Sequence, residues 1–183
     1  MAPLSSLKLF APALLLCLSL SARADTAVVI ETAPYTTSDA PRWGLGMMLG
    51  EPTGITLKRY LGGRHAFDVY LGGAYGPGVR VGFDYLWGIA RLLSDRSAAD
   101  LNFYLGVGPF VGVLRGPCGG IDNWRYQCDG DLYAGGRMPI GLELKFRTAP
   151  FSLGLEVAPG LAFAPGRAGY IVDASLVARV LFN

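Results

Sequence analysis

The chain has 183 residues, of which 51% are hydrophobic, and its formal net charge is +2. This length suits a single domain. Sixteen basic residues nearly balance fourteen acidic ones, which argues against a nucleic-acid-binding protein, because such a protein needs a basic patch. We therefore expect no nucleic-acid partner.

The first 24 residues differ from the rest of the chain. Lys8 is the only charged residue before Arg23, and an apolar run from Leu9 to Ala22 lies between them, ending in Ala22-Arg23-Ala24. A basic start, a short apolar core and a small-x-small site are typical of a secretory signal peptide. A membrane anchor is the alternative, but this run is shorter than the ~20 residues of a spanning helix. We expect residues 1–24 to be a signal peptide.

Cleavage after Ala24 leaves fourteen basic and fourteen acidic residues, and two cysteines, Cys118 and Cys128. An even cysteine count in an exported chain predicts one disulfide bond. This bond either fixes an exposed loop or supports a recognition tip built from Trp124, Arg125 and Tyr126, since such residues dominate binding hot spots. The neighbouring aspartates lack the spacing of a calcium site, so no metal is expected.

Residues 25–41 show no clear period and are interpreted as a periplasmic lead-in. From Arg42 onward, apolar residues recur with a period of two, which predicts strands. Turn residues separate eight such runs. They span Arg42–Leu49, Gly54–Leu61, His65–Ala74, Val79–Arg91, Leu101–Leu114, Leu132–Phe146, Phe151–Leu161 and Gly169–Phe182.

Each run has one apolar face and one face of glycines and charges. Two cations, Arg59 and Arg91, interrupt the apolar face. The polar face carries five positive and five negative side chains, which are Lys58, Arg80, Arg137, Lys145, Arg179, Asp68, Asp84, Glu143, Glu156 and Asp173. We interpret these ten residues as an ionic network inside a barrel, because buried charges have to be paired.

Three observations favour a barrel with its polar face inside. Glycine suits a crowded interior better than a solvated strand face, and the charges balance. The apolar face also ends in aromatic residues on one rim, as an aromatic girdle at a membrane interface does. The predicted girdle contains Trp43, Phe67, Trp87, Phe103, Phe146, Phe151 and Phe182. Arg59 and Arg91 fall near this rim, where a cation on the lipid face costs only about 0–1 kcal/mol.

The last strand alternates from Tyr170 to Phe182 and closes on an aromatic residue before Asn183. This strand is similar to the closing strand of outer-membrane barrels. With the signal peptide and the eight runs, the whole mature chain resembles the small bacterial outer-membrane barrels of the OmpA, OmpX and PagL kind. The segment Trp43–Gly54 is also similar to the opening of a group of uncharacterised bacterial barrel proteins. This resemblance implies that residues 42–183 form an eight-stranded antiparallel up-and-down transmembrane β-barrel in the outer membrane of a Gram-negative bacterium. It also implies insertion by the barrel-assembly machinery and contact with outer-membrane lipid.

Three functions remain open. The first is a non-enzymatic, monomeric envelope protein that acts structurally or binds an unidentified extracellular ligand through its outer loops. The second is a lipid A- or phospholipid-modifying enzyme, and the third is a soluble periplasmic lipocalin-like carrier. PagL-like enzymes use a histidine and a serine, but the only histidine here, His65, falls at a periplasmic turn with no serine near it in sequence. We expect the first function, with no catalytic residue and no cofactor.

Overall fold

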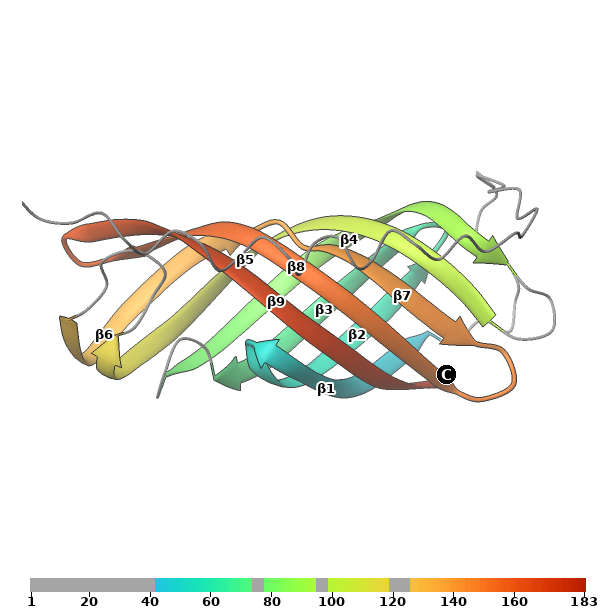
Figure 1. Cartoon of the computed structure of the whole chain (residues 1–183), viewed down its shortest axis with the longest axis horizontal. Helices are drawn as coiled ribbons and strands as arrows, with labels where there is room; N and C mark the ends of the chain where they lie inside the picture. Colours follow the sequence, from blue (N-terminus) through green and yellow to red (C-terminus); the bar gives the residue numbers. More distant parts are fainter. Residues whose placement is uncertain (1–41, 74–77, 95–98, 119–125) are drawn as a thin grey trace, which may run out of the picture.

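The computed structural model of the protein describes residues 42–73, 78–94, 99–118 and 126–183; at 93–94, 114–118, 126–131 and 167 it describes the backbone alone. The predicted signal peptide and lead-in lie outside these residues. Within them the structure is all β and contains nine antiparallel strands (Figure 1). The strands are β1 (Trp43–Glu51), β2 (Thr53–Gly62), β3 (His65–Gly73), β4 (Val79–Ser94), β5 (Ala99–Cys118), β6 (Tyr126–Arg137), β7 (Ile140–Phe146), β8 (Phe151–Ala164) and β9 (Arg167–Phe182).

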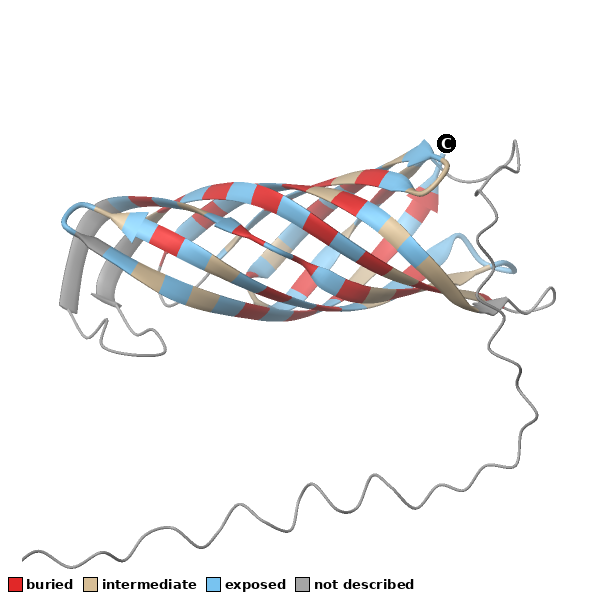
Figure 2. Ribbon diagram, turned by 90° about the horizontal axis from the view of Figure 1, so that it is seen from above, coloured by how far each residue is buried: buried red, intermediate tan, exposed pale blue. Residues whose placement is uncertain are grey.

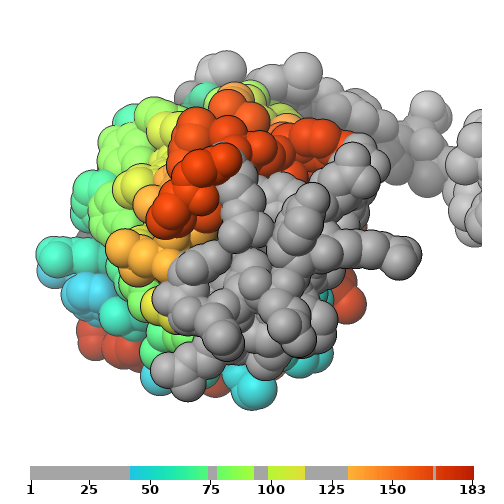
Figure 3. All heavy atoms as spheres, turned by 90° about the vertical axis from the view of Figure 1, so that its left-hand side faces the viewer, coloured from blue at the N-terminus to red at the C-terminus, as the bar shows by residue number. Residues whose placement is uncertain are grey.

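The strands form one sheet that closes on itself as a ring. β1 pairs with β2 on one side and with β9 on the other, and a β4–β5 pairing joins the first four strands to the rest. Figure 3 looks onto one end of the ring and shows the first strands, in blue, beside the last, in red. Strands paired on both sides have no free edge, so their backbone groups bond within the sheet.

The expected sixth strand, Leu132–Phe146, is divided into β6 and β7, so the prediction of eight strands was wrong by one. Met138 and Pro139 separate the two, and proline cannot donate to a strand ladder. The register nevertheless continues without a shift: Arg137 faces Gly108, and Ile140 faces Leu105. β6 and β7 therefore follow one path between β5 and β8.

Burial alternates along the strands (Figure 2). Charged, small and some aromatic residues are buried inside the ring, and most large aliphatic residues are exposed outside it. In β8, for example, Ser152 and Glu156 are buried, whereas Leu153, Leu155 and Val157 are exposed. A closed sheet whose side chains point alternately inward and outward produces this pattern. Among the described residues, no helix is long and apolar enough to cross a membrane.

Arg91 does not follow the alternation that the sequence suggested. The β4–β5 register shifts between Gly88 and Ala90 and again between Arg91 and Leu93. A bulge adds a residue and turns the following side chains to the other face. Arg91 consequently lies opposite Asn102, which is buried inside the ring. The expectation that Arg91 belongs to the outer face was wrong.

Aromatic rings inside the sheet lie over glycines of neighbouring strands. Tyr70 is opposite Gly82, and Tyr104 is opposite Gly141. In each pair, a Cβ on the glycine would overlap the ring. The same arrangement occurs for two further pairs, Phe110 with Gly135 and Tyr133 with Gly112. These glycines provide the room in which the interior aromatic side chains lie.

We predict that Gly141→Ala destabilises the fold. Its Cβ would meet the Tyr104 ring, which cannot move aside without breaking its hydrogen bond to Glu156. Overpacking of this kind costs about 1–3 kcal/mol, and urea unfolding measures it. Gly136→Ala is the control, because the nearest atom to its Cβ is the Gly108 carbonyl oxygen at 3.8 Å. Equal free energies of unfolding for the two variants would contradict the packing argument.

Candidate functional site

Arg137, the last residue of β6, is the centre of the interior. Its guanidinium lies 2.5 Å from Asp84 Oδ2 on β4, 3.2 Å from Glu156 Oε1 on β8 and 3.2 Å from Asp173 Oδ2 on β9. All four side chains are buried. A single cation therefore joins three carboxylates that project from three other strands.

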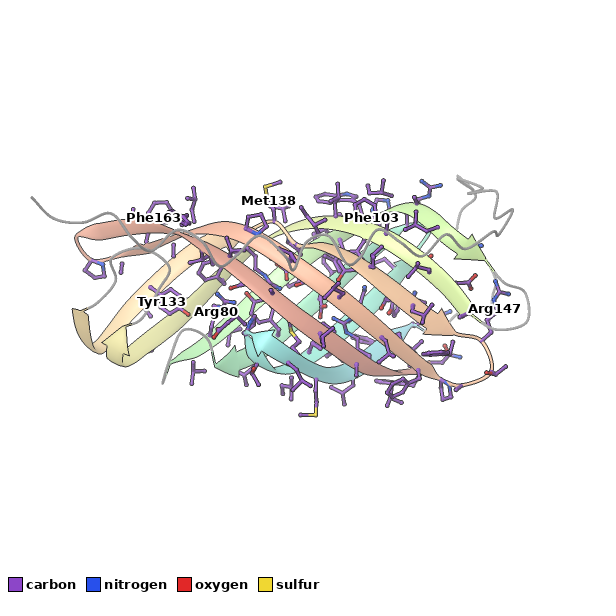
Figure 4. The ribbon with its side chains drawn as sticks, viewed as in Figure 1. Arg80, Phe103, Tyr133, Met138, Arg147 and Phe163 are labelled. Atoms are coloured by element: carbon purple, nitrogen blue, oxygen red, sulfur yellow. The ribbon has the colours of Figure 1, made fainter. Side chains whose placement is uncertain are left out.

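Arg80 extends this group toward β4 and β5. Its Nη2 lies 2.6 Å from Asp173 Oδ2, so Asp173 is shared by two arginines. The Arg80 guanidinium also lies 5.0 Å from the Phe110 ring centroid, and that of Arg137 lies 4.1 Å from the Tyr70 ring centroid. Contacts of this length between a cation and an aromatic face are attractive. Figure 4 shows Arg80 within the ring.

A second group of charges surrounds Glu143 on β7. Lys58 Nζ lies 3.1 Å and Lys145 Nζ 3.7 Å from its Oε2, and Arg179 Nη1 lies 3.7 Å from its Oε1. Tyr60 donates a hydrogen bond of 2.6 Å to the same Oε1. Three cations therefore share one carboxylate. The excess positive charge of this group is balanced in part by a second carboxylate that pairs with Arg179.

Arg179 pairs with Asp68, which also accepts a hydrogen bond from the Thr56 hydroxyl. Tyr104 lies between the two groups of charges: its hydroxyl donates a 2.8 Å hydrogen bond to Glu156, which contacts Arg137, and its ring centroid is 4.6 Å from Lys58 Nζ. The ten charged residues predicted for the interior thus form one neutral set. Nine of them are buried, and Lys145 is half-buried.

This arrangement holds the charged side chains in fixed positions inside the ring. Asp84 accepts hydrogen bonds from both Nε and Nη2 of Arg137, which fixes the orientation of the two side chains relative to each other. Removing one partner of a buried pair is strongly destabilising, because the other charge stays uncompensated. The interior therefore fastens together strands that are far apart in sequence.

Sequence reasoning missed the polar aromatic and hydroxyl residues of the interior. Tyr60, Tyr104, Thr56 and Ser152 all donate to carboxylates of the network. Their position on the polar face of their strands was the available signal. Buried carboxylates need such donors as well as cations, because ion pairs alone leave oxygen lone pairs unsatisfied.

The outer surface is apolar and has aromatic residues at both ends. The register places Phe182 opposite Trp43, Trp43 opposite Arg59, and Arg59 opposite Phe67. The other four residues of the predicted girdle lie toward the same end of the ring, with Trp87 opposite His65, Phe103 opposite Leu142, Phe146 opposite Ala99 and Phe151 opposite Val180. Figure 4 shows Phe103 and Met138 projecting outward.

Two exposed aromatic residues at the opposite end were not part of the predicted girdle. Phe163 is 55% exposed and Tyr170 51% exposed. Phe163 follows Phe151 by twelve residues on β8, and Tyr170 precedes Phe182 by twelve residues on β9. This equal spacing was a signal in the sequence that the division into runs had obscured, because Phe163 was placed beyond the seventh run.

His65 lies on the outer surface beside an aromatic residue. Its Nδ1 is 2.9 Å from the Tyr85 hydroxyl, and its ring is exposed. Within the described part of the chain no serine contacts it. The structure therefore does not bring a serine–histidine pair together among these residues.

The predicted recognition tip falls largely outside the described residues. Trp124 and Arg125 are not described, and Tyr126, Cys118 and Cys128 are described by their backbone alone. The disulfide bond stays a prediction. Among the described residues, no three histidine, cysteine, aspartate or glutamate side chains could hold a metal ion together.

Comparison with known proteins gave no match: no protein family, no curated protein sequence and no solved structure is detectably similar to this chain. Its function has to be argued from the two surfaces described above.

We predict that Arg137→Ala lowers the free energy of unfolding by about 3–5 kcal/mol, because three buried carboxylates lose their shared cation. Arg80→Ala should destabilise in the same direction. Urea unfolding of the refolded protein measures both effects. Arg59→Ala removes an exposed arginine and should change stability by no more than about 0.5 kcal/mol. Unchanged unfolding of the Arg137 variant would rule out a stabilising ionic network.

Proposed function

We propose that the protein is a transmembrane β-barrel of the bacterial outer membrane with eight strand positions, in which β6 and β7 together occupy one position. We also propose that its role is structural or recognitional rather than enzymatic. The observation that carries this proposal is the inverted burial of the ring. Charged side chains such as Arg137 and Glu143 are buried, whereas Leu155 and Leu176 are 51% and 59% exposed. A soluble domain has the opposite distribution.

The extent of the apolar surface supports a lipid environment. Exposed leucine, valine, isoleucine or phenylalanine side chains occur on all nine described strands. Soluble monomers rarely expose contiguous apolar patches beyond a few hundred Å². A lipocalin-like carrier would need these side chains inside the ring to bind a ligand, so the burial pattern argues against that alternative.

The height of this surface matches a bilayer. The aromatic residues at its two ends are twelve residues apart on both β8 and β9. With a rise of about 3.3 Å per residue and a tilt of about 40°, twelve residues span roughly 30 Å. Transmembrane barrels have an apolar band of about 25 Å between two aromatic girdles, so the spacing suits girdles at both interfaces.

The orientation follows from the strand connections. The chain crosses the barrel an even number of times, so both of its ends lie on one side. Export through a signal peptide would make this the periplasmic side. The β5–β6 connection, with Trp124 and Arg125, then faces outward. Outer loops are usually the longer ones in such barrels. Recognition of an extracellular ligand would therefore fall to the segment between Cys118 and Cys128.

We predict that the protein fractionates with outer membranes and requires detergent for extraction. On a gel, the unboiled sample should migrate faster than the boiled one, because a closed barrel resists unfolding by detergent. Recovery in the soluble periplasmic fraction, with no difference in mobility, would contradict the proposal.

We also predict that an arginine on the outer surface is tolerated according to depth. Val157 lies midway between Phe151 and Phe163 on β8 and is 43% exposed. In a bilayer, Val157→Arg should cost about 2–4 kcal/mol, whereas Phe151→Arg at the rim should lose no more than about 1 kcal/mol of lipid-transfer energy. Refolding into vesicles under a urea gradient measures both variants. In a soluble protein both exposed positions would accept arginine within about 0.5 kcal/mol, so equal stabilities would exclude a membrane location.

A further inference from the structure

The turn between β2 and β3 gathers cationic, polar and aromatic side chains on the outer surface. Gly62 and Gly63 have φ values of 88° and 61°, a conformation that favours glycine, and they reverse the chain within a few residues. The turn therefore brings Arg59 at the end of β2 close to the start of β3. We call the group Trp43, Arg59, His65, Phe67, Tyr85 and Trp87 the rim patch.

Arg59 is an exposed cation on an otherwise apolar face. Its guanidinium lies 4.9 Å from the Trp43 ring centroid, and its cross-strand neighbours are Trp43 and Phe67. Within the described part of the chain no carboxylate pairs with it. The stacking fixes the planar group and leaves its edge available to an outside partner. A guanidinium edge matches the oxygens of a phosphate in a bidentate fashion.

His65 adds a second polar group to the same patch. The Tyr85 hydroxyl lies 2.9 Å from its Nδ1, which orients the imidazole. When Nδ1 accepts this hydrogen bond, the neutral ring carries its proton on Nε2 and can donate there. The backbone register puts Gly62 opposite His65 and Arg59 opposite Phe67, so the two donors flank the turn on the same face.

An aromatic column continues from the rim patch toward the middle of the ring. Tyr85 lies 4.9 Å from Trp87 and 5.0 Å from Phe67, and Phe67 lies 5.0 Å from Phe83, all between ring centroids. Such tilted and edge-to-face contacts hold the rings in fixed orientations. Phe83 is 42% exposed, so the column offers a rigid apolar surface directly above the polar groups.

We propose that the rim patch binds one anionic glycerophospholipid of the surrounding membrane. The Arg59 guanidinium and the His65 Nε2 hold its phosphodiester, and one acyl chain packs along Phe67 and Phe83. The occupant is a lipid rather than a free phosphate, because the polar groups and the aromatic column follow one another as a headgroup and its acyl chains do. This inference rests on the membrane location proposed above.

The test compares lipids retained by the detergent-purified protein in native mass spectrometry, with equimolar phosphatidylglycerol and phosphatidylcholine supplied. The wild-type protein should retain phosphatidylglycerol in preference. Arg59→Gln should reduce this preference about tenfold, as expected for the loss of one charge-assisted hydrogen bond. Soluble glycerophosphate at the same concentration should not displace the lipid.

Arg147→Gln is the matched control, since Arg147 is an exposed arginine at the same end of the ring that pairs with Asp100 at 2.8 Å. It should keep the wild-type preference. Equal lipid preference in the Arg59 variant and the wild type, or displacement by glycerophosphate, would overturn the inference. If the gel shift and the membrane fractionation persist in that case, only the lipid site fails. If both are lost in the wild type, the membrane proposal itself fails.

Discussion

The contact of Arg137 with Asp84, Glu156 and Asp173 is the interaction on which the interior depends. Closing the sheet removes one face of every strand from solvent, so each charge on that face has to find its counter-charge across the ring. Arg137 touches carboxylates on three other strands. Arg137 is the last residue of β6, and Pro139, which cannot donate a backbone hydrogen bond, follows it closely. Side-chain ion pairs therefore stabilise the junction between β6 and β7, where the ladder of backbone hydrogen bonds is interrupted.

The limited space inside the ring is the second constraint. It is met by placing large interior side chains opposite glycines, which have no side chain. Tyr104 can reach Glu156 only because Gly141 leaves room for its ring. Tyr70 likewise lies over Gly82 and under the Arg137 guanidinium. The glycines and the charged residues of the polar face therefore act together in filling the interior. They let aromatic rings cross the interior and fill the space between ion pairs that would otherwise need water.

Much of this could be predicted from the alternation of residues, because side-chain direction in a strand has a period of two. The separation into a charged and an apolar face follows from that period alone, as do the approximate strand limits. What failed depends on local breaks in the period. Pro139 interrupts a strand without shifting its register, and the bulges around Gly88 and Leu93 bring Arg91 opposite a buried residue. The donor roles of Tyr60 and Tyr104 depend on cross-ring distances, which a one-dimensional pattern does not contain.

The two faces place opposite demands on the surroundings. The ten-residue ionic network of the inner face has five positive and five negative side chains, which neutralise one another. The outer face has almost no polar group between its aromatic ends, so water is a poor solvent for it and hydrocarbon a good one. Arg59 is an exception on this face, because it is a cation held against Trp43. In the proposed membrane its guanidinium would lie at the boundary between hydrocarbon and headgroups. Because the interior network neutralises itself, the surroundings act on the protein mainly through its apolar outer surface. This is the reason why the proposal of a membrane location depends on the outer surface and not on the interior.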